Sequence, residues 1–277
     1  MRNTVRQKRV KKARVIPGFR CTFGIVVLML SLIVLIPLAS VLVYSLKISP
    51  GEFFSLLWKS NVRNAFLTSI GCSLVAAGIN TVFGVIVAWT LVKYDFPGKR
   101  IVDGLIELPF ALPTAVAGIT LSKLYSETGF FGKMLAGIGI KVTYTKTGLV
   151  IALVFVGLPF VIRAVQPVLE KLDGQYEEAA YMLFGRVILP ELRPAILTGF
   201  GLALARGIGE YGSVIYISGN SAKEKTQVVS YVIMQKLSYI DYESATAIAL
   251  VMLVLSFVLL LFVNIVQARQ AARTNLL

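Results

Sequence analysis

Two charged residues inside an apolar stretch of the last third of the chain are candidates for chemistry. Arg206 and Glu210 lie four residues apart in F-G-L-A-L-A-R-G-I-G-E-Y-G, which places them on one face of a helix. An ionisable pair near the middle of a membrane span is costly unless its members are paired or hydrated. The pair therefore indicates either a functional site or an ion pair that holds helices together. Gly199, Ala203 and Gly207 recur at the same spacing and predict close helix packing.

Two prolines in L-P-F-A-L-P-T-A-V-A-G form the second candidate. Pro109 and Pro113 each remove an amide donor and clash with the carbonyl four residues earlier, so a broken or strongly kinked helix is expected. A membrane tolerates such a break only where the freed carbonyls face protein or water. A structural kink is the alternative. The candidate residues of a translocation pathway are thus Pro109, Pro113, Thr114, Arg206, Gly209 and Glu210.

The chain lacks the sequence motifs of common hydrolytic and metal-dependent enzymes. It has no histidine, and Gly98-Lys99 and Gly132-Lys133 are not followed by the serine or threonine of a phosphate-binding loop. A G-x-S-x-G nucleophile motif is also missing. We therefore expect no catalytic residue, metal site or cofactor on this chain, and any ATP and magnesium would be used by a partner. An intramembrane enzyme is the alternative from another class.

The composition indicates an all-α polytopic membrane protein. Hydrophobic residues make up 56% of the 277 residues and charged residues only 15%, far fewer than a soluble surface carries. Several apolar stretches reach the roughly 20 residues that a membrane-spanning helix needs. The net charge of +14 comes mainly from the N-terminal tail and short loops, where it orients helices, so we expect no nucleic-acid partner.

Six membrane spans are predicted in one transmembrane domain, 21–277, that follows a basic cytoplasmic tail, 1–20. The even number of spans and the bias of basic residues predict that both chain ends lie on the cytoplasmic side. The outer loop 219–244 is expected to hold a short helix near 228–236. The spans are 21–46 (interrupted by Pro37), 64–92, 101–124, 148–166, 195–218 and 245–266.

Three further charges lie near the cytoplasmic ends of the third and fourth spans. Glu107 and Arg163 fall inside the spans, and Asp103 is expected at the interface. The long Arg163 side chain could simply extend to the interface, as arginines near helix ends do.

The inner segment 167–194 is the longest polar interruption in the second half of the chain. From Tyr176 it reads Y-E-E-A-A-Y-M-L-F-G-R-V-I-L-P, which combines acids, small residues and an apolar run that ends at Pro190. The helix-forming residues predict a short helix over 177–183, with the chain re-entering the membrane soon after Pro190. On the cytoplasmic side, this segment is accessible to a soluble partner.

The segment resembles the EAA loop of ABC importer permeases. The chain from about residue 17 onward is similar to the T-type permease subunits of sulfate and thiosulfate importers, which belong to the MetI-like family. The segments that carry the resemblance are Y-D-F-P-G-K at 94–99, L-P-F-A-L-P-T-A-V-A-G at 108–118, K-V-T-Y-T at 141–145, P-F-V-I-R-A-V-Q-P-V-L-E at 159–170 and G-E-Y-G-S-V-I-Y-I-S-G-N at 209–220. The double-proline and G-E-Y-G segments narrow the resemblance to the sulfate and molybdate group.

The resemblance implies a permease of the type I ABC importer fold that forms half of a translocation pathway. It also implies a sister permease in a heterodimer, two copies of an ATPase and an external sulfate-binding protein, all in the lipid of a bacterial cytoplasmic membrane. A plastid inner envelope is the alternative location, and a molybdate or tungstate importer is the alternative function. The residues expected to contact the ATPase are Glu177, Glu178, Ala179, Ala180, Leu183, Phe184 and Pro190.

The chain departs from the family pattern inside this coupling loop. About seven residues are missing between Leu183 and Phe184, which would shorten a helical loop by roughly 10 Å.

Overall fold

The computed structural model describes residues 19–172 and 188–274, and every regular element within these ranges is a helix. In this part of the chain, five helices are long and apolar enough to cross a membrane, and a bent pair of helices makes a sixth candidate span. The predicted all-α polytopic class is confirmed. The long elements are α1–η1–α2 (Phe19–Leu30, Ser31–Leu35 and Ile36–Ser45), α4 (Ser60–Lys93), α9 (Lys146–Lys171), α11 (Ile188–Ile208) and α14 (Tyr242–Thr274). The short helices are α3 (Pro50–Trp58), α5 (Lys99–Ile106), α6 (Leu108–Ala111), α7 (Thr114–Leu124), α8 (Phe130–Ala136), α12 (Gly212–Ile217) and α13 (Val229–Ser238).

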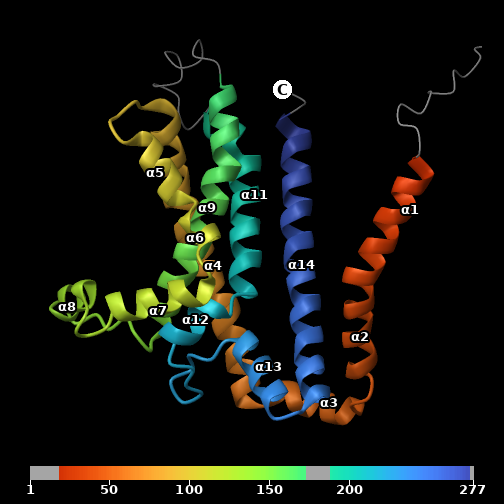
Figure 1. Cartoon of the computed structure of the whole chain (residues 1–277). Coiled ribbons are helices and arrows are strands. Elements are labelled where there is room, and N and C mark those ends of the chain that lie inside the picture. The colour runs from red at the N-terminus through yellow and green to blue at the C-terminus, as the bar shows by residue number, and fades with distance from the viewer. Residues whose placement is uncertain (1–18, 173–187, 275–277) are drawn as a thin grey trace, which may run out of the picture.

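Helices α4, α9 and α11 pack together as the core of the bundle (Figure 1). Two glycines allow this approach from either side of Val161 on α9. A Cβ atom added to Gly84 would lie 2.7 Å from the Val161 Cβ, and one added to Gly199 would lie 2.7 Å from the Val161 Cα. Gly207, two turns beyond Gly199, packs in the same way against Ser73 of α4. The predicted stripe of small residues is therefore confirmed as a close-packing surface.

The first span stands at the edge of the bundle and reaches it through α2, which packs against α14 (Figure 1). A π-helical turn at Ser31–Leu35 lies directly before Pro37, where an interruption was predicted. The apolar side chains of this span are almost all exposed. Lipid or a partner helix must therefore cover them.

The beginning of α1, the turn between α4 and α5 and the end of α14 lie at one end of the bundle, whereas α3 and α13 lie at the other (Figure 1). This arrangement agrees with chain ends on one side, and the assignment of that side to the cytoplasm stays a prediction. Helix α13 confirms the short helix expected near 228–236. Helix α3 was missed, although its capping box of Ser49 and Glu52 has the readable signature S-P-G-E.

Two spans are interrupted. The third consists of α5 and α6 followed by α7, with a bend of 111°, so the predicted break is confirmed. The prediction of one continuous fifth span over 195–218 is wrong, because α11 ends at Ile208 and α12 begins at Gly212. The composition stays apolar across both helices, so hydropathy gives no sign of the break. The break is fixed by the Glu210 side chain, which accepts a hydrogen bond from a backbone N–H at the start of α12.

Candidate translocation site

The two interrupted spans meet at their breaks, where the first turn of α7 lies against the first turn of α12. A Cβ atom added to Gly212 would overlap the Thr114 Oγ1 and lie 3.1 Å from the Ala115 nitrogen. One added to Gly118 would overlap the Ser213 carbonyl oxygen and lie 2.8 Å from the Ser213 Cα. Any side chain at either glycine would therefore separate the two helices. The double-proline segment and the G-E-Y-G segment thus form one site.

The break in the third span occurs between α6 and α7. Leu112 is extended and still donates its N–H to the Leu108 carbonyl at 2.9 Å. The Pro113 carbonyl accepts the N–H of Val116, in the first turn of α7, at 2.9 Å. Pro109 lies in α6, and Pro113 caps α7. Phe110 and Val116, on either side of the break, are about half exposed. Irregular backbone is not stable against lipid, so this face must meet water or protein.

Glu210 lies in the break of the fifth span, and its side chain is only 1% exposed. Its Oε1 accepts hydrogen bonds from the Ser213 N–H at 2.8 Å and the Ser213 hydroxyl at 2.9 Å. Its backbone carbonyl accepts the hydroxyl of Ser230 at 2.8 Å. The carboxylate therefore fixes the start of α12 and is fully partnered.

Arg206 completes this arrangement from the last turn of α11. Its Nη1 pairs with the Glu210 Oε2 at 2.5 Å, as the spacing predicted, but Glu210 lies beyond the helix end rather than on the helix face. The Arg206 side chain remains 36% exposed. The guanidinium has five N–H donors, so the partly exposed side chain can reach a second acceptor as well as Glu210. Gly209 is exposed beside it and leaves the approach open.

Sequence reasoning missed four contributors to this site. Ser213 and Ser230 hold Glu210, and Gly118 and Gly212 permit the helix contact. Gly212 is the last residue of the G-E-Y-G motif, so the motif could have indicated that this glycine is part of the site. The serines have no distinguishing pattern, because their role depends on where α12 and α13 fold.

Arg163, which could have extended to the membrane interface, has three side-chain partners within the bundle. Its Nη1 bonds the Asp103 Oδ1 at 2.8 Å and the Gln166 Oε1 at 2.7 Å, and its Nη2 bonds the Glu107 Oε1 at 2.8 Å. The side chain thus turns toward α5 and stays 30% exposed. The spacing of Asp103 and Glu107, four residues apart, predicts two carboxylates on one helix face. The sequence does not indicate that Arg163 is their common partner.

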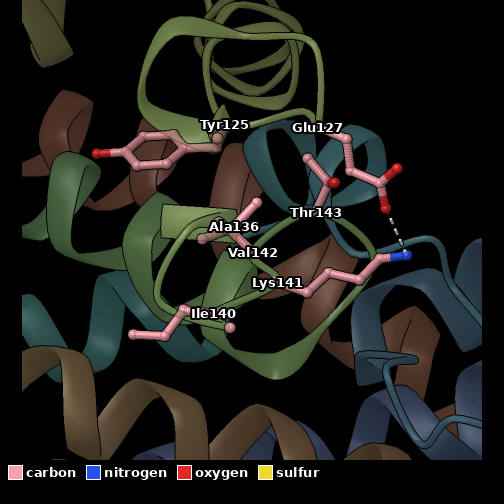
Figure 2. Close-up of a pocket in the computed structure, with 9 residues that line it drawn as sticks. Tyr125, Glu127, Ala136, Ile140, Lys141, Val142 and Thr143 are labelled. Carbon is pink, nitrogen blue, oxygen red and sulfur yellow. Dashed lines mark ion pairs between the residues drawn. The ribbon is translucent and has the colours of Figure 1, made fainter. Parts of the chain in front are cut away.

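A separate cavity of about 310 Å³ lies in the loop between α7 and α9. Figure 2 shows the Lys141 ammonium group directed at the Glu127 carboxylate across its rim, and the two are 3.1 Å apart. Tyr125 and Thr143 also line the cavity. This cavity shares no residue with the two helix breaks, so we do not include it in the pathway.

Most of the predicted coupling residues fall outside the described ranges. Glu177, Glu178, Ala179, Ala180, Leu183 and Phe184 are among them, as is the helix expected over 177–183. Pro190 is described and lies in the first turn of α11. In residues 19–172 and 188–274 no cluster of three or more potential metal ligands occurs, and the lack of a metal site stays a prediction.

Comparisons with known proteins identify the group to which this architecture belongs. Residues 80–275 match the family described as binding-protein-dependent transport system inner membrane component. The chain belongs to this family. It is therefore a multi-pass inner-membrane transport subunit rather than an enzyme. The family description names a binding-protein-dependent transport system, so this permease is one component of a larger transporter that includes a substrate-binding protein.

The permease is similar along nearly its whole length to characterised relatives. It is 44% identical over 271 residues to the sulfate transport system permease protein CysT of Salmonella typhimurium and to that of Escherichia coli, covering 95% of this chain and 98% of each relative. It is 42% identical to a probable sulfate transport system permease protein of Nephroselmis olivacea, covering 84% of both chains.

Solved structures support the fold. A bacterial alginate ABC transporter in complex with an alginate-bound periplasmic protein superposes with a TM-score of 0.75 at 17% identity, covering 91% of this chain and 94% of that one. At this identity the likeness concerns the fold alone.

Proposed function

We propose that this permease forms one half of the translocation pathway of an ATP-driven importer of sulfate or thiosulfate. The observation that carries the proposal is the 44% identity to sulfate permeases over 95% of the chain. The meeting of two broken helices beside a partly exposed arginine supports it, since this arrangement suits an anion.

The site offers three favourable contacts to a tetrahedral dianion. The N-terminus of α7 carries a partial positive charge, and Thr114 at its first position adds a hydroxyl donor. The Arg206 guanidinium can direct two parallel N–H groups at oxygens of the anion. Glu210 cancels most of the net charge of Arg206, so the anion is held weakly and leaves readily, as conduction requires. No covalent bond is made or broken on this chain.

The assembly we propose contains a sister permease, two copies of an ATPase that binds ATP and magnesium, and an external sulfate-binding protein. Both ends of this chain lie in the cytoplasm, together with the segment 167–194. The ATPase dimer closes on ATP, this coupling segment transmits the movement, and the bundle alternates between outward and inward openings. The coupling segment is shorter than the family pattern at the junction of Leu183 and Phe184, so cross-linking this segment to the ATPase tests whether the contact still forms.

Reconstitution of the complete complex in proteoliposomes tests the function. With a sulfate-specific binding protein outside, labelled sulfate should accumulate only with internal ATP, and hydrolysis should rise when sulfate is added. A complex with a hydrolysis-deficient ATPase is the control. Stimulation by molybdate or tungstate but not by sulfate would refute the assignment in favour of the alternative importer.

A further inference from the structure

Helix α5 is the inner half of the broken third span, and it has little apolar anchorage of its own. None of its residues is buried, and the Ile101 and Leu105 side chains are 69% and 55% exposed. Ile106, at its end, is its one partly buried apolar residue in contact with the core around α9. The position of α5 on the bundle therefore depends on polar contacts.

Arg163 of α9 supplies these contacts through both terminal nitrogens of one guanidinium group. Nη1 bonds the Asp103 carboxylate, and Nη2 bonds the Asp103 carbonyl at 3.2 Å and the Glu107 carboxylate at 2.8 Å. Gln166, one turn further along α9, accepts a second bond from Nη1 at 2.7 Å and so fixes the fork. We call these four residues the Arg163 clamp.

The clamp restricts geometry more than it adds stability. The side chains of Arg163, Asp103 and Glu107 are 30%, 40% and 61% exposed, so water screens each ion pair. A planar fork that engages two carboxylates and a carbonyl nevertheless permits only one orientation of α5. Glu107 is also the junction between α5 and α6, so the clamp holds the inner half of the span at its last turn.

The two halves of the third span consequently pack against different ends of α9, the outer half through Leu121, which lies against the cluster of Leu149, Ala152 and Leu153. The inner half is tied to α9 by the clamp and by an edge-to-face contact of Phe110 with Phe160, whose ring centroids are 5.0 Å apart. The outer half, α7, is tied to α12 through Gly118 and Gly212. The extended, non-helical Leu112 and Pro113 join the two halves.

We propose that Arg163 is a positioning residue that makes α5 and α6 follow α9 during the transport cycle. Helix α9 ends at Lys171, directly before the segment that carries the coupling residues. Movement of its inner end is then passed through the clamp to Leu112 and Pro113 and changes the contact of α7 with α12. The inference rests on the proposed function, because it assigns a route by which ATP hydrolysis reaches the pathway.

The test measures anion uptake per ATP hydrolysed in the reconstituted complex. Arg163→Gln should lower this ratio about tenfold or more, while ATP hydrolysis per assembled complex stays within about twofold of wild type. Asp103→Asn with Glu107→Gln should have the same effect, and adding Arg163→Gln to them should cause no further loss. Arg100→Gln is the matched control, because Arg100 is an exposed arginine of α5 outside the clamp, and its ratio should be that of wild type.

Arg163→Lys keeps the charge but loses the fork, so it separates positioning from folding. Its ratio should fall between those of wild type and Arg163→Gln. A wild-type ratio for Arg163→Lys or for Arg163→Gln would overturn the proposal, even if the other variant fails to assemble. Assembly is measured by co-purification of the ATPase with the permease.

Covalent replacement of the clamp provides the positive test. With Cys21 and Cys72 replaced, Asp103→Cys and Arg163→Cys are joined by a short bifunctional thiol reagent. The cross-link should restore the ratio that the two substitutions lower. Loss of transport on cross-linking would show that the clamp must open, and would overturn the rigid connection. All ratios are taken with the oxyanion that wild type transports, so a wrong substrate assignment shows in wild type and leaves the clamp test valid.

Discussion

The ion pair between Arg206 and the buried Glu210 gives the sharpest prediction, because the two side chains differ so much in exposure. The Glu210 side chain is 1% exposed and the Arg206 side chain 36%. We compare Arg206→Met, Glu210→Gln and the double variant. Glu243→Gln is the control, since Glu243 is an exposed carboxylate in the first turn of α14.

The costs follow from what each substitution leaves behind. Arg206→Met leaves a buried carboxylate without its counter-charge, and breaking such a pair costs about 3–5 kcal/mol. Glu210→Gln leaves a guanidinium that water can reach and keeps an acceptor for the Ser213 N–H, so we expect about 1–3 kcal/mol. The double variant carries neither charge. It should therefore be more stable than Arg206→Met by about 1–3 kcal/mol, the usual coupling of contacting residues.

The assay is the apparent melting temperature of the purified permease in detergent, followed by size-exclusion chromatography after heating. With roughly 2–3 °C per kcal/mol for a chain of this size, Arg206→Met should melt about 10 °C below wild type, and the double variant should recover several degrees. The Glu243→Gln control should stay within about 1 °C, as surface substitutions do.

Two results would refute the reasoning. If the double variant melts no higher than Arg206→Met, the two residues are not a simple pair. If the double variant is stable and still imports the anion at the wild-type rate, Arg206 is not an anion contact and serves packing alone.

Two further predictions concern the helix contact and the start of α14. Gly118→Ala should destabilise the permease by about 1–3 kcal/mol and reduce uptake, because its Cβ would meet the Ser213 backbone. Gly209→Ala is the control and should melt as wild type does, because the nearest atom to its Cβ would be 3.8 Å away. Equal melting temperatures for the two variants would contradict the close contact. Burial raises the pKa of Asp241, but hydrogen bonds from Lys236 and Ser244 outweigh it and hold the pKa below the ordinary value of 3.8, so its contribution is present above about pH 4 and is lost as the pH falls further. Asp241→Asn loses the charge but keeps the N-cap to Ser244, so it should cost less than about 1 kcal/mol, and Asp241→Ala should cost about 1 kcal/mol more. When melting temperatures are measured between pH 7 and pH 3, the gap between each variant and wild type should shrink only at the acid end.

The helix break at Pro109 and Pro113 could be predicted because the effect of proline on a helix is local. The missing amide and the ring clash act within four residues, whatever the rest of the chain does. At Pro37 the predicted interruption is only a π-helical turn in a continuous span, whereas the small-residue stripe through Gly199 follows from local spacing and is confirmed. The class and most of the spans follow from hydropathy, which is also a property of contiguous sequence.

The course of the fifth span could not be predicted in this way. Its composition remains apolar from α11 into α12, and the break depends on a carboxylate that bonds a backbone group three residues later. Glu210 in turn is stable there only because Arg206 and the hydroxyl of Ser230, twenty residues away, complete its environment. Arg163 presents the same difficulty, since its partners on α5 and at the α5–α6 junction are 60 and 56 residues distant in sequence.

The two helix breaks depend on each other, because together they form the contact between α7 and α12. Pro113 turns α7 so that its first residue, Thr114, can reach the start of α12, and Gly212 leaves room for it there. A straight third span would keep Thr114 on the course of α5, and a straight fifth span would carry Glu210 along α11, away from the Ser213 N–H that it caps. Because each break places groups that the other requires, the double-proline segment and the G-E-Y-G segment must change together to preserve the contact between α7 and α12.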